Sequence, residues 1–135
     1  MAANVIVDAG FLVALLVRSE TRHQWAVGRL PHLPTPWKTC EAALSEAFYL
    51  LGVNGSKLAA LVQRRGVVCP FHLSEEIDEV LKLMAKYADV PMSFADACLV
   101  RMTEMLSDSV LVTLDSHFRV YRRHGNKTIP CLIPN

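Results

Sequence analysis

The sequence lacks an excess of charge of either sign. Its 135 residues carry 14 Lys and Arg against 13 Asp and Glu, which gives a formal net charge of +1. A strongly basic chain would have indicated nucleic acid, and this balance removes that argument without excluding any partner. The chain shows no internal repeat and no low-complexity segment, and 52% of its residues are hydrophobic. Its length and composition predict one packed domain over residues 1–135.

Cysteine is sparse and widely spaced. None of the four cysteines forms a C-x-x-C pair or has a histidine at zinc-ligand spacing, which argues against a zinc site. Three of them lie in apolar runs, where cysteine acts as a small hydrophobe. We therefore expect reduced thiols and a cytoplasmic protein. These cysteines are Cys40, Cys69, Cys98 and Cys131.

Long hydrophobic runs are also missing. The apolar run at residues 11–17 follows an acid and is too short to cross a bilayer. The N-terminus has no basic region of the kind that opens a signal peptide. We therefore expect no membrane association.

Apolar strands alternate with amphipathic helices instead. Residues 4–8, NVIVD, predict a strand that is apolar on both faces, which is typical of a buried parallel strand. A helix is predicted at residues 10–17, and further strands at VVCPFHL, VLVTLD and TIPCLI. This alternation predicts an α/β fold with a parallel sheet covered on both faces.

Capping residues and glycines predict the helix ends. Ser19 or Thr21 is expected to cap a second helix, and Ser74 a helix with an acidic first turn. Gly52 should end the helix CEAALSEAFYLL. A short helix is predicted over HFRVYRRH.

Two acids follow directly from apolar strands. Asp8 ends the first strand and Asp115 ends VLVTLD, and in a parallel sheet both strands end at the same edge. Open α/β sheets bind ligands beyond this edge. Taken alone, Asp8 is equally well explained as a turn residue that caps the next helix.

Two further acids are expected to join them. An acid on an apolar helix face needs a partner or a cation, and Glu46 shares such a face with Ala42, Ala43, Tyr49 and Leu50. Glu41 competes for this role, but it lies about 140° round the helix from Glu46 and in the first turn, where acids have a helix-end explanation. We prefer Glu46.

Asp96 is the fourth candidate. The pattern Ser93-x-x-Asp96 predicts a capping box, which would explain this acid without any function. Its combination with three acids from other elements favours a functional role. Crowded carboxylates suit Mg²⁺ or Mn²⁺, which can activate water and stabilise a leaving oxygen in phosphoryl transfer. Thr113 points to the same strand face as Asp115 and can support the site, although it is also an ordinary β-branched strand residue.

A basic cluster follows Asp115 in the chain. Its side chains could contact RNA phosphates, or could equally form a solvated helix end. The cluster consists of Arg119, Arg122, Arg123, His124 and Lys127.

Four segments, taken in order, resemble the PIN domain, in particular the small single-domain toxins of the VapC type. They are VIVDAGFLVALL, ALSEAFYLL, SFADACLV and VLVTLDSHFRVYRRHG. The resemblance implies a three-layer α/β/α sandwich with a central, mainly parallel sheet. It also implies a Mg²⁺- or Mn²⁺-dependent ribonuclease that forms a homodimer and is inhibited by an antitoxin protein. The acids that the family uses as catalytic residues and metal ligands correspond to Asp8, Glu46, Asp96 and Asp115.

The chain departs from the family pattern at two positions. Gly10 stands where relatives often carry Ser or Thr, so a hydroxyl contact is absent there. Ser116 follows Asp115, where some relatives have another polar or acidic residue. Whether this position supplies an additional metal ligand is therefore left undecided by the sequence.

Three other protein classes share features with this sequence. A phosphorelay receiver needs an acid at the end of its middle strand, and VVCPFHL has none. A phosphatase of the haloacid dehalogenase type needs D-x-D after its first strand, where this chain has Asp8-Ala9-Gly10. A PIN-fold module that binds RNA or protein with little catalysis stays open.

Overall fold

A five-stranded sheet forms the centre of the computed structural model, which describes residues 2–135. Its strand order is β3-β2-β1-β4-β7, and every neighbouring pair is parallel, as the sequence predicted. The proline-containing segment after Val68 leaves β3 short and at the edge, where a missing backbone donor is tolerated. The strands are β1 (Asn4–Val7), β2 (Trp37–Lys38), β3 (Val67–Val68), β4 (Ser109–Val112) and β7 (Cys131–Leu132).

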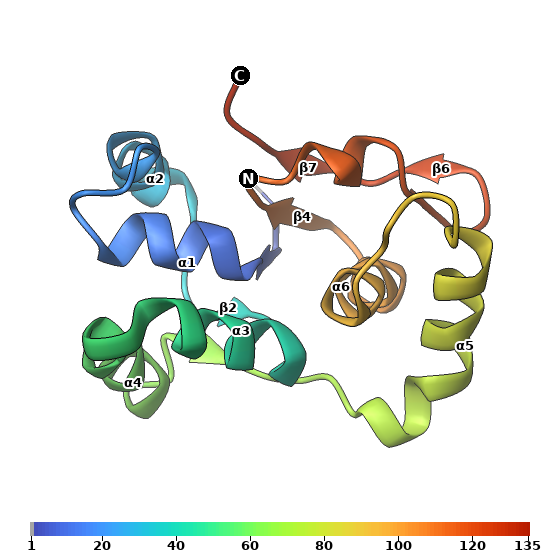
Figure 1. Cartoon of the computed structure of the whole chain (residues 1–135), viewed down its shortest axis with the longest axis horizontal. Coiled ribbons are helices and arrows are strands. Elements are labelled where there is room, and N and C mark those ends of the chain that lie inside the picture. Colours follow the sequence, from blue (N-terminus) through green and yellow to red (C-terminus); the bar gives the residue numbers. More distant parts are fainter. Residues whose placement is uncertain (1) are drawn as a thin grey trace.

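Helices cover both sides of this sheet (Figure 1). The first four helices gather on one side and the last two on the other, which gives three layers. The predicted α/β/α sandwich is therefore confirmed. The helices are α1 (Ala9–Leu16), α2 (His23–Arg29), α3 (Glu41–Leu51), α4 (Gly55–Gln63), α5 (Leu73–Lys86) and α6 (Phe94–Met105).

Each side of the sheet has its own hydrophobic core. Val5 and Val7 of β1 lie in the core under α1, whereas Ile6 between them lies in the core under α6. This alternation follows from the two-residue period of a strand. It explains why β1 is apolar at consecutive positions, because both of its faces are buried.

Helix α3 bridges the two cores. Ala43 packs in the core with α6, while Ala47 and Leu51 pack in the core with α1. The helix ends at Gly52, which adopts a φ of +53° that a side chain would disfavour, as predicted. Because α3 contacts both α1 and α6, it is held where the two layers meet.

The predicted helix caps at Ser19, Thr21 and Ser74 are wrong. Helix α2 begins after Arg22 and α5 begins after His72, and neither cap residue makes a side-chain capping bond. A good cap contributes only about 1 kcal/mol, so tertiary contacts can outweigh it.

The predicted helix HFRVYRRH is also wrong beyond its first turn. Residues Ser116–Arg119 form a 3₁₀ helix, and β5 (Arg122–Arg123) then pairs with β6 (Lys127–Thr128) in an antiparallel hairpin. His124 and Gly125 have positive φ angles of 51° and 84°, which reverse the chain. The segment TIPCLI therefore splits between β6 and β7 instead of forming one strand.

The four cysteines are free thiols, as predicted. Cys40 and Cys98 are buried in the core between α3 and α6, where they act as small hydrophobes. Within residues 2–135, no helix has both the length and the apolar character needed to span a bilayer.

Leu111 tests the core beneath α6. Its side chain is fully buried in the middle of β4, so Leu111→Ala should lower the free energy of unfolding by roughly 2–5 kcal/mol. Leu81→Ala, at a half-exposed position on α5, should change it by about 0.5 kcal/mol or less. Urea unfolding of the three proteins measures both values, and equal losses would contradict this assignment of the core.

Candidate active site

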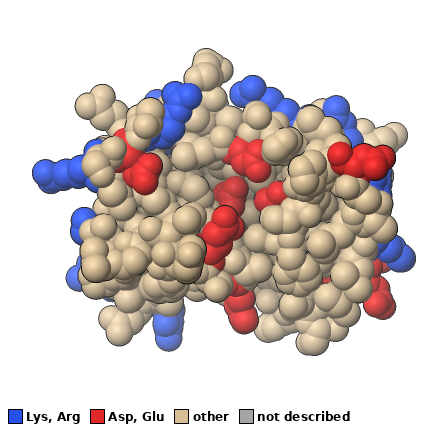
Figure 2. Space-filling model, in the orientation of Figure 1, with Lys and Arg blue, Asp and Glu red and all other residues tan. Residues whose placement is uncertain are grey.

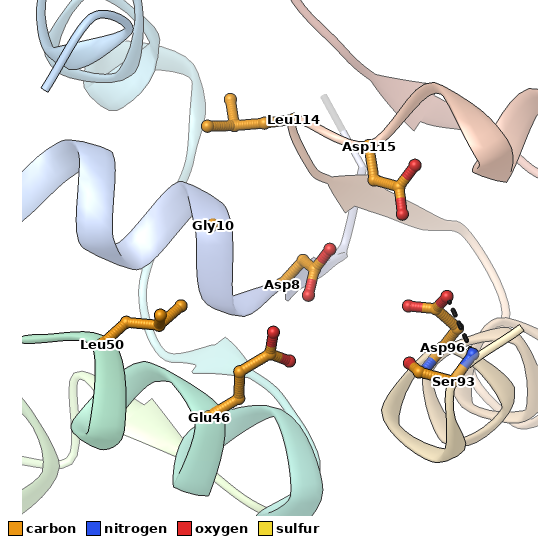
Figure 3. Close-up of a pocket in the computed structure, with 8 residues that line it drawn as sticks. All are labelled: Asp8, Gly10, Glu46, Leu50, Ser93, Asp96, Leu114 and Asp115. Atoms are coloured by element: carbon orange, nitrogen blue, oxygen red, sulfur yellow. Dashed lines mark hydrogen bonds between the residues drawn. The ribbon is translucent and has the colours of Figure 1, made fainter.

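A cavity of about 380 Å³ opens beyond the C-terminal ends of β1 and β4. Figure 2 shows acidic side chains gathered in a central hollow of this face, with the Lys and Arg side chains at the outer edges of the molecule. The four acids expected from the sequence all line the cavity, and each comes from a different part of the chain (Figure 3). They are Asp8, Glu46, Asp96 and Asp115, and the remaining lining residues are Gly10, Leu50, Ser93 and Leu114.

Strand pairing brings Asp8 and Asp115 together. Val7 of β1 lies opposite Val112 of β4, and the Asp8 backbone N–H donates to the Val112 carbonyl at 3.1 Å. Because β1 and β4 are parallel, their C-terminal ends lie at the same edge of the sheet. Asp8 also caps α1, so the two roles weighed for it from the sequence coexist.

Thr113 connects the two acids directly. Its hydroxyl donates to Asp8 Oδ2 at 2.8 Å and accepts the Asp115 backbone N–H at 3.0 Å. The side chain is fully buried, so these bonds form away from competing water. Thr113 therefore fixes both neighbours, which an ordinary strand residue would not do.

Burial sets the acidity of Asp8. Only 9% of the residue is exposed, and this desolvation raises the pKa of its carboxyl to about 6. Hydrogen bonds from Thr113 and from the Ala9 backbone N–H lower the pKa in part, while the charges of Asp96 and Glu46 raise it further. The pKa of Asp8 therefore depends on the charges of two other acids that line the cavity.

Asp96 forms the predicted capping box and also lines the cavity. Its backbone N–H donates to Ser93 Oγ at 3.0 Å, and its Oδ2 accepts the Ser93 backbone N–H at 3.2 Å. Burial raises the pKa of Asp96, and the charge of Asp115 adds to that rise. The capping role and the cavity position are therefore compatible.

Glu46 reaches the cavity, but the argument from an apolar helix face is only partly right. The Glu46 side chain is exposed, and so are its neighbours Tyr49 and Leu50, whereas Ala43 on the same face is buried. The face is therefore covered only toward the start of the helix. Its carboxylate extends from α3 toward Asp8 (Figure 3). Glu41 instead borders a separate small cavity near Phe71, as the helix geometry predicted.

Two residues that the sequence did not single out contact the acids. His117 donates its backbone N–H to Asp115 Oδ1 at 2.9 Å, and its ring Nδ1 lies 2.9 Å from the same oxygen. An Asp followed by a turn commonly accepts such a bond, so this spacing was a usable signal. Tyr121 donates its hydroxyl to Asp96 Oδ2 at 3.3 Å, across 25 residues, for which no local signal exists.

The basic cluster divides into two kinds of residue. Arg122 Nη1 donates to the carbonyls of residues 119–121, and Arg123 Nη1 donates to the Thr103 carbonyl at 2.9 Å. These guanidinium groups therefore satisfy backbone acceptors. Arg119 and Lys127 are exposed.

The cavity is not a closed metal cage. Within residues 2–135, no three His, Cys, Asp or Glu side chains converge closely enough to enclose an ion on their own. The arrangement is an open group of hard oxygen donors with room for water between them.

Comparisons with known proteins agree with this architecture. The family model described as the PIN domain matches residues 5–123. The chain belongs to the PIN domain family. This confirms the resemblance seen in the sequence.

A solved structure shows the same fold. It is the crystal structure of VapC20 from Mycobacterium tuberculosis, described as a toxin that cleaves the sarcin-ricin loop. The two proteins share 19% sequence identity with a TM-score of 0.75, over 84% of this PIN domain and 91% of VapC20. A comparison with curated protein sequences gave no match.

The raised pKa of Asp8 predicts a pH-dependent stability. Because the pKa is about 6 in the folded protein against an ordinary 3.8, the folded state holds this proton more tightly than the unfolded state. The carboxyl therefore destabilises the fold increasingly as the pH rises through that window. In EDTA, Asp8→Asn should gain roughly 2–3 kcal/mol of unfolding free energy relative to the parent between about pH 4 and pH 7.

Urea unfolding at a series of pH values measures this difference. The matched control is Asp89→Asn, at an exposed position outside the cavity. A difference between Asp8→Asn and the parent that stays constant with pH would show that burial does not perturb this carboxyl.

Proposed function

We propose that this PIN domain is a Mg²⁺- or Mn²⁺-dependent ribonuclease that hydrolyses RNA phosphodiester bonds with a metal-activated water. The observation that carries the proposal is the convergence of four carboxylates from four separate segments on one open cavity. Such a group is costly to assemble for structure alone, since like charges repel and burial disfavours ionisation. A functional role is therefore the better explanation for this group of acids.

The donor set fits a hard divalent cation. All four acids offer carboxylate oxygens, which Mg²⁺ and Mn²⁺ prefer. Mg²⁺ usually keeps several waters and binds through one or two carboxylates, so an open cavity suits it better than a closed cage. When bound, the ion would offset the charge of the phosphate and acidify a water molecule.

The residues differ in how firmly they are held. Asp8 and Asp96 are fixed by several hydrogen bonds and would hold the ion in a constant place, with Thr113 supporting Asp8. Glu46 is exposed and Asp115 is half-buried, and they would hold the ion or orient its waters beside the substrate. All four would thus serve as metal ligands and catalytic residues.

An exposed apolar surface supports the proposal that this domain binds other proteins. Large side chains at the end of α3 and just after it remain uncovered, with exposures of 85% for Tyr49 and 97% for Val53. Contiguous exposed apolar residues of this kind often mark an interface. We propose that this PIN domain acts as the toxin of a type II toxin–antitoxin pair in the cytoplasm, as a homodimer that an antitoxin protein inhibits.

Metal-dependent cleavage is the first test of this function. The purified protein should cleave single-stranded RNA with Mg²⁺ or Mn²⁺ and stop when EDTA is added. Asp8→Asn, Glu46→Gln, Asp96→Asn and Asp115→Asn should each lower kcat by roughly 100-fold, because each removes a negative charge that would hold the metal ion, and the ion's positive charge stabilises the transition state. Cleavage of a labelled RNA measures the rates.

Glu41→Gln is the matched control, since Glu41 lies on the same helix as Glu46 but outside the cavity. It should keep the parental rate. Loss of activity in Glu41→Gln with retention in Glu46→Gln would overturn the assignment on α3. Binding of RNA without cleavage under any metal would identify a PIN-fold binding module instead.

RNA binding by the basic cluster is a separate prediction. We propose that its cationic side chains Arg119, Arg122, Arg123 and Lys127 contact phosphates, chiefly Arg119 and Lys127, whose charges are exposed. Replacing these two by Gln should weaken binding to all RNA sequences and lower the salt slope by about one unit per residue. Arg122→Gln should mainly lower the melting temperature, because its guanidinium supports backbone carbonyls. An unchanged salt slope in the Arg119 and Lys127 variant would assign these residues to the solvated surface.

A further inference from the structure

The hydroxyl of Tyr121 donates a hydrogen bond to one oxygen of Asp96, an acid that lines the cavity. We propose that this tyrosine is a positioning residue: its hydroxyl holds Asp96 Oδ2, so that the other oxygen, Oδ1, is presented to the metal and substrate. The inference rests on the proposed function, because it assigns a role within the same carboxylate site. It adds a residue that lies outside the cavity lining and acts only through Asp96.

Two donors meet at the same carboxylate oxygen. Asp96 Oδ2 accepts the Tyr121 hydroxyl at 3.3 Å and the Ser93 backbone N–H at 3.2 Å. Figure 3 shows the Oδ2 bond to Ser93, with the second oxygen of Asp96 pointing toward Asp8 and Glu46. One oxygen is thus committed to the protein and the other to the cavity.

The Tyr121 ring cannot easily move. It is fully buried, and it packs edge-on against Tyr87 and Phe118 at centroid distances of 5.1 Å and 5.3 Å. The His117 ring stacks on it at 6.4 Å. A phenol fixed on three sides is a preorganised donor that loses little conformational freedom in the bond.

With a single hydrogen-bond donor, the orientation of the Asp96 carboxylate would be less well defined. The terminal torsion of Asp is broad and roughly two-fold, so either oxygen of Asp96 can in principle occupy either position. A second donor on the same side favours one arrangement and aims the remaining lone pairs. Partners of metal-binding carboxylates commonly act in this way.

Tyr121 also couples two acids that lie on different elements. It follows the 3₁₀ helix Ser116–Arg119, whose N-terminal cap is Asp115, while Asp96 opens α6. The hydroxyl therefore ties the segment after Asp115 to the helix that carries Asp96.

Tyr121→Phe tests the inference, because it keeps the ring and removes only the hydroxyl. Its matched control is Tyr87→Phe, in the same aromatic cluster, whose hydroxyl accepts the Arg122 backbone N–H and does not contact an acid. Isothermal titration with Mn²⁺ in the absence of RNA should show affinity lowered roughly tenfold or more for Tyr121→Phe and unchanged for Tyr87→Phe. The kcat for RNA should fall in Tyr121→Phe with KM unchanged, and melting curves check that both variants fold.

Each outcome decides the matter. Equal Mn²⁺ affinity in the parent and Tyr121→Phe, or equal losses in both variants, would overturn the role of Tyr121 while leaving the proposed ribonuclease intact. No Mn²⁺ binding by the parent would reject the metal site together with this role. Selective loss of Mn²⁺ affinity in a protein that cleaves no RNA would support the role of Tyr121 and reject the ribonuclease.

Discussion

The pairing of β1 with β4 is the constraint on which the rest of the site depends. Their register sets Val7 opposite Val112, so that the next residues of both strands emerge side by side. Thr113 can then donate to Asp8 in a buried place where water does not compete. A slip by one residue would turn Thr113 to the other face of the sheet and leave the Asp8 carboxyl without its strongest partner.

The four acids form a series from fixed to adaptable. Both oxygens of Asp8 accept hydrogen bonds, Asp96 has two donors on one oxygen, and Asp115 is held through Oδ1. Glu46 lies exposed on a longer side chain. The cavity therefore combines carboxylates held in fixed positions with one, Glu46, whose side chain is free to adjust.

Strand ends were the most predictable part of the site. Consecutive apolar residues followed by an acid placed Asp8 and Asp115 at the strand ends, because both faces of a central strand are buried and only its end reaches solvent. Glu46 lines the cavity as expected, but the helix face that predicted it is exposed at Tyr49 and Leu50, so the reason for the prediction was incomplete. Tyr121 could not be predicted, since its partner lies 25 residues away and only the folded chain defines the contact. The caps predicted at Ser19 or Thr21 and at Ser74 failed for a similar reason, because packing outweighed these weak local signals.

The order of strands in the sheet has a consequence for how the protein is made. The first strand synthesised occupies the middle of the sheet, and the contact between Asp8 and Thr113 spans 105 residues. Contacts of such high sequence separation form late, because the intervening chain must first be closed into a loop. In a nascent chain still on the ribosome the four acids therefore lie apart, and the cavity that they line forms only after β4 has emerged and paired with β1.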